Sequence, residues 1–555
     1  MNKTNLLLTR MRQNWKSGVT VALVSLPLSV SLAIASQTTP IVGIITAIWA
    51  GLMGALFGGS NFNIIGPTGA LSGILATFAI IHGADTLPAL AVVSGILILA
   101  SYLLRLERFL IFIPGSTIQG FTLGVAFIIG FNQMNFALGL NGLAKHEKFI
   151  LNVLESFKHV GSTSPGAVFV FALFLAGLFL LLKLTPKIPG AITLTPIGIL
   201  LGFLSQNGYI PLSLQTLGTK FGNINPTLFI RPTFFFDYSL LVTAVTVAVV
   251  AILETMISAK IADGMTKTKH NSRKEMLGLG MANIMSGLMG GIPATAALAR
   301  TAVNIKSGAN SNVSAVISCT SIAIISLLLL PFFNYIPMAV IASILVFAAL
   351  RMIEIHEIVN FIKHDKKSLL VCLLVFFITV YEDPMIGILA GTAVSLLIFI
   401  EKLSRGQFDL IMNDPKKGIV GKMSGEKITS SLKDHDTLVY SIKGTLAYIN
   451  GQAHVVRFSQ GLNGYKNIIL RLRELYFIDL DGIDALDEII DIIRSQKRKV
   501  VISSVEDAIA AQLERESDGY RSLKKDKLIF SKTTDALKFL GYNPGSIKKP
   551  VRQKK

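Results

Sequence analysis

The stretch GLMGALFGGSNFNIIGPTGA, residues 51–70, interrupts an apolar segment in the same way as the stretch GLMGGIPATAA, residues 287–297. In each, an apolar helix ends at a double glycine, a short extended piece follows, and a new helix begins at a turn with proline and threonine. Broken helices in corresponding positions of two halves point to the substrate site of a membrane transporter. A helix that begins at mid-bilayer directs unpaired N–H groups and a positive dipole end into a cavity. Two facing helix starts therefore predict a site for a small anion.

The composition is that of a membrane protein. Hydrophobic residues make up 51% of the 555 residues and charged residues 15%. Between residues 16 and 405 we expect about 14 membrane-spanning segments of roughly 20 residues each, with shorter ones at the two breaks. If seven segments form each half, the breaks fall in the third and tenth segments, which are equivalent positions of an inverted repeat. The sequence thus predicts an α-helical polytopic membrane protein.

Lysine and arginine recur in alternate loops, and this placement accounts for much of the formal net charge of +19. It is the positive-inside pattern, which places the N-terminus in the cytoplasm, and an even number of segments returns the C-terminal part to the same side. The loop 145–158 is an exception with mixed charge. We expect no nucleic-acid partner. The basic clusters lie in residues 10–16, 105–108, 183–187, 260–274 and 363–367.

After residue 405 the chain becomes polar and alternates strand-like and helix-like pieces, which predicts a small α/β domain with a parallel sheet. The chain is expected to divide into five parts. These are a cytoplasmic N-terminal segment (1–15), a membrane domain (16–405), a linker (406–432), the α/β domain (433–543) and a basic tail (544–555) that we expect to be disordered.

Catalytic and metal-binding patterns are missing from the sequence. It contains no Walker A motif, no dinucleotide fingerprint and no histidine or cysteine spacing typical of a metal site. Its two cysteines, Cys319 and Cys372, lie in apolar segments and are expected to be packing residues. We therefore expect a protein that is not an enzyme and holds no cofactor.

Glu254 lies in an otherwise uncharged apolar helix over residues 244–257. A carboxylate there is costly and marks a functional site by default, because it can load a proton or help to hold Na⁺. Ser258, four residues on, shares its helix face and could add an oxygen ligand. The alternative is a structural carboxylate that pairs across the bundle, for example with Arg300.

Arg300 follows the second break by about one helical turn and has small or apolar neighbours. It is the obvious counter-ion for a bound anion, although its side chain could instead extend to the interface near Lys306. Thr68 and Thr295, at the two helix starts, could cap those helices or contact the substrate.

Several stretches together resemble one known family. They are GVTVALVSLPL (18–28), both breaks, DGMTKTKHNS (263–272) and ARTAVNIKSG (299–308). This combination resembles the sulfate permease (SulP) family, and ILRLRELYFIDLDG (469–482) resembles its C-terminal STAS domain. The resemblance implies a 7+7 inverted repeat divided into core and gate, and a homodimer.

The resemblance also implies roles for residues at the matched positions. Anion binding falls between the half-helices, and the family's acidic residue of the eighth helix matches Glu254. Some relatives have Asp there with Thr four residues later, so Glu254 with Ser258 favours H⁺ over Na⁺ as coupling ion. Soluble STAS relatives carry a phosphorylatable Ser where this chain has Asp481, so we expect a dimerising or regulatory role in place of a phosphorylation switch. The matched substrate positions are Thr68, Gly69, Ala296, Ala297 and Arg300.

Taken together, the sequence predicts a secondary active transporter of sulfate, bicarbonate or a small dicarboxylate in the inner (cytoplasmic) membrane. Coupling to H⁺ or Na⁺ would drive symport or exchange by alternating access. One alternative is an anion channel without coupling. Another is a nucleobase permease of the same architecture, against which Arg300 and the STAS-like domain count.

Overall fold

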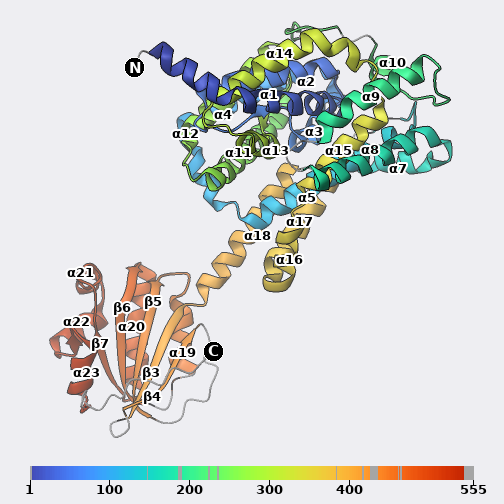
Figure 1. Cartoon of the computed structure of the whole chain (residues 1–555). Coiled ribbons are helices and arrows are strands. Elements are labelled where there is room, and N and C mark those ends of the chain that lie inside the picture. The colour runs from blue at the N-terminus through green and yellow to red at the C-terminus, as the bar shows by residue number, and fades with distance from the viewer. Residues whose placement is uncertain are drawn as a thin grey trace. The chain divides into compact units, whose positions relative to one another are not determined.

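The computed structural model describes residues 3–144, 146, 148–185, 190–222, 225–233, 237–382, 384–414, 418–425, 435–460, 462 and 465–542. The chain forms two compact units, residues 1–395 and 396–555, and the division falls inside the helix α18 (Figure 1). The tail predicted from residue 544 lies outside the described residues.

The first unit is almost entirely helical. Within the described residues, nine helical segments are long and apolar enough to cross a membrane. With the five shorter helices α3, α9, α12, α13 and α17, the series forms two sets of seven. The first set is α1 (Lys3–Ala35), α2 (Pro40–Phe57), α3 (Gly69–His82), α4 (Leu87–Leu104), α5 (Gly115–Asn132), α8 (Pro165–Leu184) and α9 (Gly190–Gln206). The second set is α11 (Tyr238–Thr266), α12 (Ser272–Leu288), α13 (Leu298–Lys306), α14 (Val313–Phe333), α15 (Met338–Met352), α17 (Lys366–Tyr381) and α18 (Pro384–Ser404).

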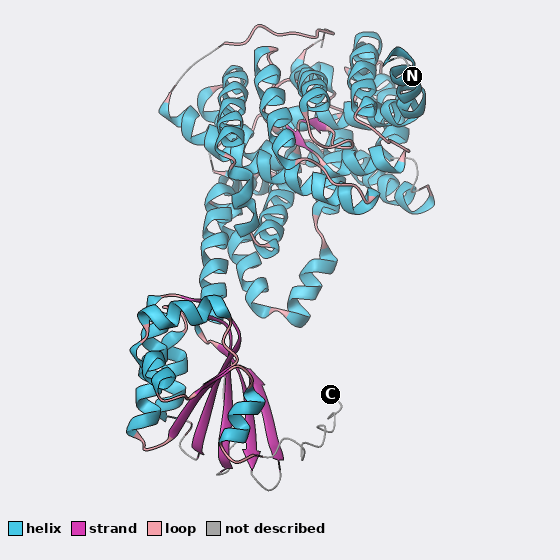
Figure 2. Ribbon diagram, turned by 90° about the vertical axis from the view of Figure 1, so that its left-hand side faces the viewer, coloured by secondary structure: helices cyan, strands magenta, loops and turns pink. Residues whose placement is uncertain are grey.

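Short elements connect these helices. They are η1 (Ala84–Thr86), η2 (Leu106–Phe112), α6 (Met134–Leu138), α7 (Phe149–Lys158), η3 (Val160–Ser162), α10 (Leu217–Phe221) and α16 (Ile355–His364). Two strands of two residues each, β1 (Ile65–Gly66) and β2 (Thr295–Ala296), lie among the helices (Figure 2).

The membrane helices pack in two groups. In the first group, α4 and α2 pack on α12, α14 and α2 pack on α1, and α11 packs on α4. In the second group, α17 and α15 pack on α5, and α8 packs on α15 and α9. Each group contains helices from equivalent positions of the two sets. This is the arrangement expected for an inverted repeat with a core and a gate. Both breaks belong to the first group.

The second unit is a six-stranded sheet with helices on both faces. Its strand order is β4-β3-β5-β6-β7-β8, in which β5 to β8 are parallel and β3 is antiparallel to both of its neighbours. The residues predicted as a linker, 406–432, contribute β3 and β4 to this sheet. The strands are β3 (Gln407–Asp414), β4 (Gly418–Gly425), β5 (His435–Leu446), β6 (Tyr465–Ile478), β7 (Lys499–Ser503) and β8 (Ile529–Phe530).

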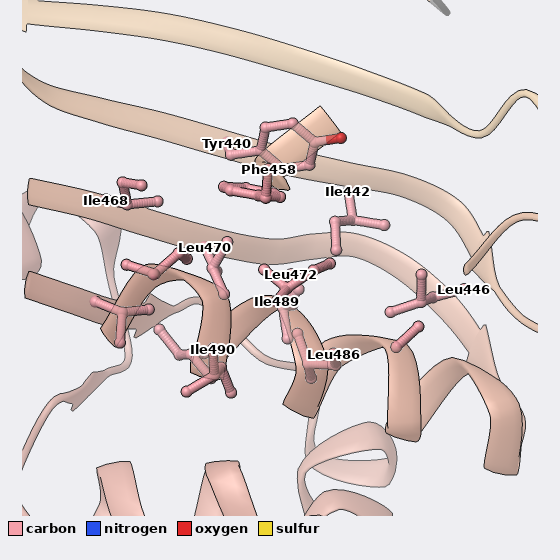
Figure 3. Packing of buried hydrophobic residues seen from close by; sticks show 14 of the residues in the cluster. Tyr440, Ile442, Leu446, Phe458, Ile468, Leu470, Leu472, Leu486, Ile489 and Ile490 are labelled. Atoms are coloured by element: carbon pink, nitrogen blue, oxygen red, sulfur yellow. The ribbon is translucent and has the colours of Figure 1, made fainter. Parts of the chain in front are cut away.

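Side chains alternate across β6 because successive residues of a strand point to opposite faces. Ile468, Leu470 and Leu472 pack with Leu486, Ile489 and Ile490 of α20 (Figure 3), whereas Ile469 packs with Leu537 of α23 on the other face. The helices are α19 (Gly451–Gln460), α20 (Leu480–Ser495), α21 (Asp507–Glu516), α22 (Asp518–Lys525) and α23 (Thr533–Phe539).

Candidate functional site

The two breaks meet at the centre of the helical unit. Strands β1 and β2 pair antiparallel, with Ile65 opposite Ala296 and Gly66 opposite Thr295. The helix α3 begins three residues after β1 and α13 begins two residues after β2, so this pairing fixes both helix starts. Neither of the two N-cap residues, Thr68 and Ala297, makes a side-chain capping hydrogen bond. The first N–H groups of each helix have no intrahelical acceptor and remain available to a ligand.

Glu254 reaches the start of α3. Its Oε2 accepts a hydrogen bond of 2.9 Å from Oγ1 of Thr68, a residue that is 3% exposed. The Thr68 hydroxyl thus serves the carboxylate and does not cap α3. Thr295 takes part in a separate contact, since its Oγ1 lies 2.8 Å from Oγ1 of Thr255 and donates to the carbonyl of Ala251.

Arg300 lies with its guanidinium group against the first break. The residue is 1% exposed, and its Nη2 donates to the carbonyl oxygen of Pro67. Among the residues that the structure describes, its Nη1 has no hydrogen-bond partner. The side chain therefore points into the protein and does not extend to the interface with Lys306. The group occupies the space beside Gly66, where a Cβ atom would lie 2.3 Å from Nη1.

The charges of Glu254 and Arg300 interact electrostatically, but each makes its hydrogen bond elsewhere, to Thr68 and to Pro67. The arrangement brings one carboxylate, one guanidinium group with a free donor and two helix starts to one place. Chemically, such a set can bind an anion and can change its own charge through the carboxylate.

The remaining predicted residues lie close to the breaks with different roles. The N–H of Ala296 donates to Oγ1 of Thr255, and the N–H of Ala297 donates to the carbonyl of Ile64, so both donors are engaged. Neither of these two N–H groups is therefore available to a ligand. Gly69 begins α3, and a Cβ there would lie 2.4 Å from Cδ1 of Ile129.

Ser258 is held in a polar network beneath the first break. Its Oγ donates to Oδ1 of Asn63 over 2.9 Å and lies 3.1 Å from Oγ1 of Thr301. All three residues are buried. A role of Ser258 as a cation ligand stays a prediction. In the described part of the chain, no group of three His, Cys, Asp or Glu side chains is arranged to hold a metal ion.

Glu275 was not predicted. It lies in the first turn of α12 and is 1% exposed, and its carboxylate binds the backbone of the first break. Its sequence context, directly after Arg273 and Lys274, is typical of a solvated helix start. Asn271, which caps α12 four residues earlier, marks the helix start but does not tell which helix face is buried, so the sequence held no signal for the burial of Glu275.

Comparison with known proteins gives one consistent result. The model of the sulfate permease family matches residues 11–375, and the STAS domain model matches residues 430–517. The chain is 30% identical over 500 residues to the protein YvdB of Bacillus subtilis, whose name assigns it provisionally to sulfate transport. That match covers 89% of this chain and 92% of the relative.

Two further relatives extend the comparison. The bicarbonate transporter BicA of Picosynechococcus is 26% identical over 411 residues, with 71% of each chain covered. The solved structure of the murine Slc26a9 anion transporter in the inward-facing state superimposes with a TM-score of 0.80 at 14% identity. It covers 95% of this chain and 91% of the other, which shows a shared fold.

Proposed function

The chain belongs to the sulfate permease family, and from this premise we propose that it is a secondary active transporter that carries a small oxyanion together with a proton. The family consists of multi-pass membrane transporters and not of enzymes. The proposal adds the class of substrate, the coupling ion and the residues that carry each.

One observation carries the proposal. The Nη1 group of Arg300 is buried with no hydrogen-bond partner in the described part of the chain, next to two helix starts whose own N-cap residues make no side-chain capping bond. A buried cationic donor without a partner is costly, because it has lost its hydration and gained no hydrogen bond. An oxyanion bound between α3 and α13 would accept from Nη1 and from the free N–H groups, and would offset the positive ends of both helices.

Sulfate and bicarbonate are the two substrates that we propose to test first. The names of the relatives YvdB and BicA refer to sulfate and to bicarbonate, respectively. Both anions have several oxygen acceptors and fit a site of N–H donors. A small dicarboxylate is the third member of the panel. Membership of this family leaves nucleobase transport without support.

Glu254 is the proposed coupling residue. A deprotonated Glu254 would repel an anion bound beside Arg300, whereas a protonated one would not. Proton binding and anion binding therefore favour each other, and linkage makes this effect reciprocal. Na⁺ near Glu254 and Ser258 would have the same electrostatic effect and is the competing proposal.

The inverted repeat supports alternating access, in which the first helix group moves against the second and exposes the breaks to each side in turn. We further propose that both termini lie in the cytoplasm, as the basic loops suggest, and that the protein acts as a homodimer in the cytoplasmic membrane.

The test is uptake of labelled sulfate, bicarbonate and succinate into proteoliposomes under an imposed proton or Na⁺ gradient. We expect gradient-driven accumulation of one oxyanion by the wild type, and its loss in Glu254→Gln while exchange without a gradient remains. Glu354→Gln, at an exposed position, is the matched control. Accumulation unchanged in Glu254→Gln would contradict the coupling role, and fast flux that does not saturate would favour an uncoupled channel.

A further inference from the structure

The carboxylate of Glu275 is fully bonded inside the helical unit, and anion binding as proposed above does not use it. Oε2 accepts hydrogen bonds of 2.7 Å from the N–H groups of both Gly59 and Ser60, directly after α2 ends. Oε1 accepts a third bond of 2.7 Å from Nδ2 of Asn63. Hydrogen bonds to an ionised acceptor are about twice as strong as neutral ones, so this carboxylate holds the first break firmly.

Asn63 extends the connection to α11. Its Oδ1 accepts from Oγ of Ser258 over 2.9 Å, and its Nδ2 also lies 3.2 Å from the carbonyl of Thr255. Ser258 is one helical turn beyond Glu254 on the same helix. The first break is thus tied to the helix that carries the proposed coupling residue.

The network continues to α13. Oγ1 of Thr301 lies 3.1 Å from Ser258 Oγ and accepts a bond of 3.2 Å from the N–H of Ile64. Ser258 and Thr301 are 0% exposed. One buried chain of hydrogen bonds therefore joins α12, the first break, α11 and α13.

The second break is held differently. Asn283 donates from Nδ2 to the carbonyl of Ala294 and accepts from its N–H, at 2.9 and 2.8 Å. Ser286 donates to the carbonyl of Ile292, whose N–H donates to Thr46. These side chains are all neutral. Thr295 and Ala296 are also tied to α11, through neutral bonds to Thr255 and Ala251. The charged anchor belongs to the first break alone.

We propose that Glu275 and Asn63 are positioning residues of the anion site. They hold the first break in register with α11, so that Thr68 at the start of α3 stays against Glu254 and Pro67 stays against Arg300. The inference rests on the proposed site between α3 and α13. It gives Ser258 the role of a link in this network, whatever the coupling ion is.

A reciprocal exchange tests the contact between the two side chains. Asn63→Asp places two carboxylates face to face and removes the donor. Glu275→Gln presents an amide N–H₂ to the N–H₂ of Asn63. The double variant restores a donor opposite an acceptor, with the glutamine oxygen still able to accept from Gly59 and Ser60 and the aspartate still able to accept from Ser258.

We expect each single variant to raise the KM for sulfate, or for bicarbonate if the wild type takes that anion, by about tenfold, as for loss of one charged hydrogen bond. The double variant should recover most of this loss, because the donor–acceptor contact between the two side chains is restored. Recovery should be incomplete, since Gly59 and Ser60 then bond a neutral oxygen and the bond to the Thr255 carbonyl is lost. Asn14→Asp is the matched control, because Asn14 is equally buried and bonds Asn310 and Ser311 away from the breaks. Its KM should stay unchanged.

The proposal would be overturned if both single variants kept the wild-type KM. It would also be overturned if the KM of the double variant rose by the product of the two single-variant increases. If Asn63→Asp does not fold, the KM of Ser258→Ala, measured with and without Na⁺, tests the proposal instead. A raised KM with and without Na⁺ supports a link in the network, whereas an unchanged KM, or an effect seen only with Na⁺, contradicts it. Failure of the proposed function differs from these results, since the wild type itself would then accumulate neither anion.

Discussion

The guanidinium group of Arg300 has two separate roles in the proposed site. Its Nη2 is committed to the carbonyl of Pro67, and its Nη1 is left without a partner at the proposed anion site. A planar guanidinium group can serve both directions at once because its donors are fixed in a fork. A lysine ammonium group is a single compact charge and cannot span both contacts in the same geometry.

Arg300→Lys should therefore keep the charge but raise the KM for the transported oxyanion by about tenfold or more. Uptake into proteoliposomes measures this effect. Lys306→Ala, exposed on the same helix, is the control and should retain the wild-type KM. Equal values for Arg300→Lys and the wild type would show that the fork geometry is unimportant.

The sequence identified single residues where an apolar surrounding makes their charge energetically costly. A charge in an apolar helix identifies Glu254 and Arg300 without any knowledge of their partners. Glu275 is also charged but lies in the first turn of α12, directly after Arg273 and Lys274, where charges are ordinary, so its burial could not be inferred. Ser258 was predicted from helix spacing, and that spacing could not reveal that Asn63 and Thr301 surround it.

At the scale of elements, the two breaks are stabilised by each other. An isolated two-residue strand has no independent stability, and β1 and β2 exist because each supplies the ladder partner of the other. Glycine at position 66 lets the Arg300 guanidinium group approach the backbone. The close approach is thus a property of the paired breaks and not of either one.

Gly66→Ala tests this approach. The added Cβ would lie 2.3 Å from Nη1 of Arg300, so the guanidinium group must move away from the site. We expect an overpacking cost of about 1–3 kcal/mol and an oxyanion KM raised by about tenfold, measured by uptake. Gly264→Ala adds a methyl group where no atom lies within 4 Å and should transport as the wild type does. A normal KM in Gly66→Ala would show that Arg300 does not need its observed position.

Across the whole molecule, the two units place their apolar side chains differently. The helical unit exposes large apolar side chains such as Leu103 and Leu328, at 71% and 69%, as expected for a surface that faces lipid. The C-terminal unit buries its apolar side chains in two clusters, one on each face of the sheet. Its stability therefore follows the rules of soluble domains, including a dependence on pH.

His454 of α19 is a buried titratable group that contributes to this dependence. It is 0% exposed, and its Nδ1 lies 2.7 Å from the Tyr440 hydroxyl and 3.2 Å from Nη1 of Arg457. Burial, and then the charge of Arg457, lower the pKa of His454 to about 3 from an ordinary value of 6.5. The folded unit thus holds His454 neutral, whereas the unfolded chain protonates it below about pH 6.5.

The contribution of His454 to stability is therefore present above about pH 6.5 and is lost as the pH falls toward 3. Hydrogen exchange of α19 in the full chain, corrected for the intrinsic pH dependence, should show faster opening over this range. His454→Phe should flatten the pH dependence. At neutral pH its α19 should open more often than in the wild type, because the buried Tyr440 hydroxyl loses its hydrogen-bond acceptor, at a cost of about 1–3 kcal/mol. His356→Gln, 93% exposed in its side chain, should behave as the wild type. A pH profile unchanged by His454→Phe would assign the dependence to other groups.

Local sequence patterns were enough to predict a membrane protein with two helices broken in equivalent positions, followed by an α/β domain. Hydropathy, glycine and proline punctuation and strand alternation are local properties, so they are present in the sequence. Tertiary structure decided which groups meet: Arg300 with Pro67, 233 residues apart, and Glu275 with Asn63, 212 residues apart. Such contacts depend on the three-dimensional path of the chain, and neither residue type nor spacing encodes them locally. The sequence predicted where an anion site would lie, and the fold supplied the contacts that hold the proposed site in place.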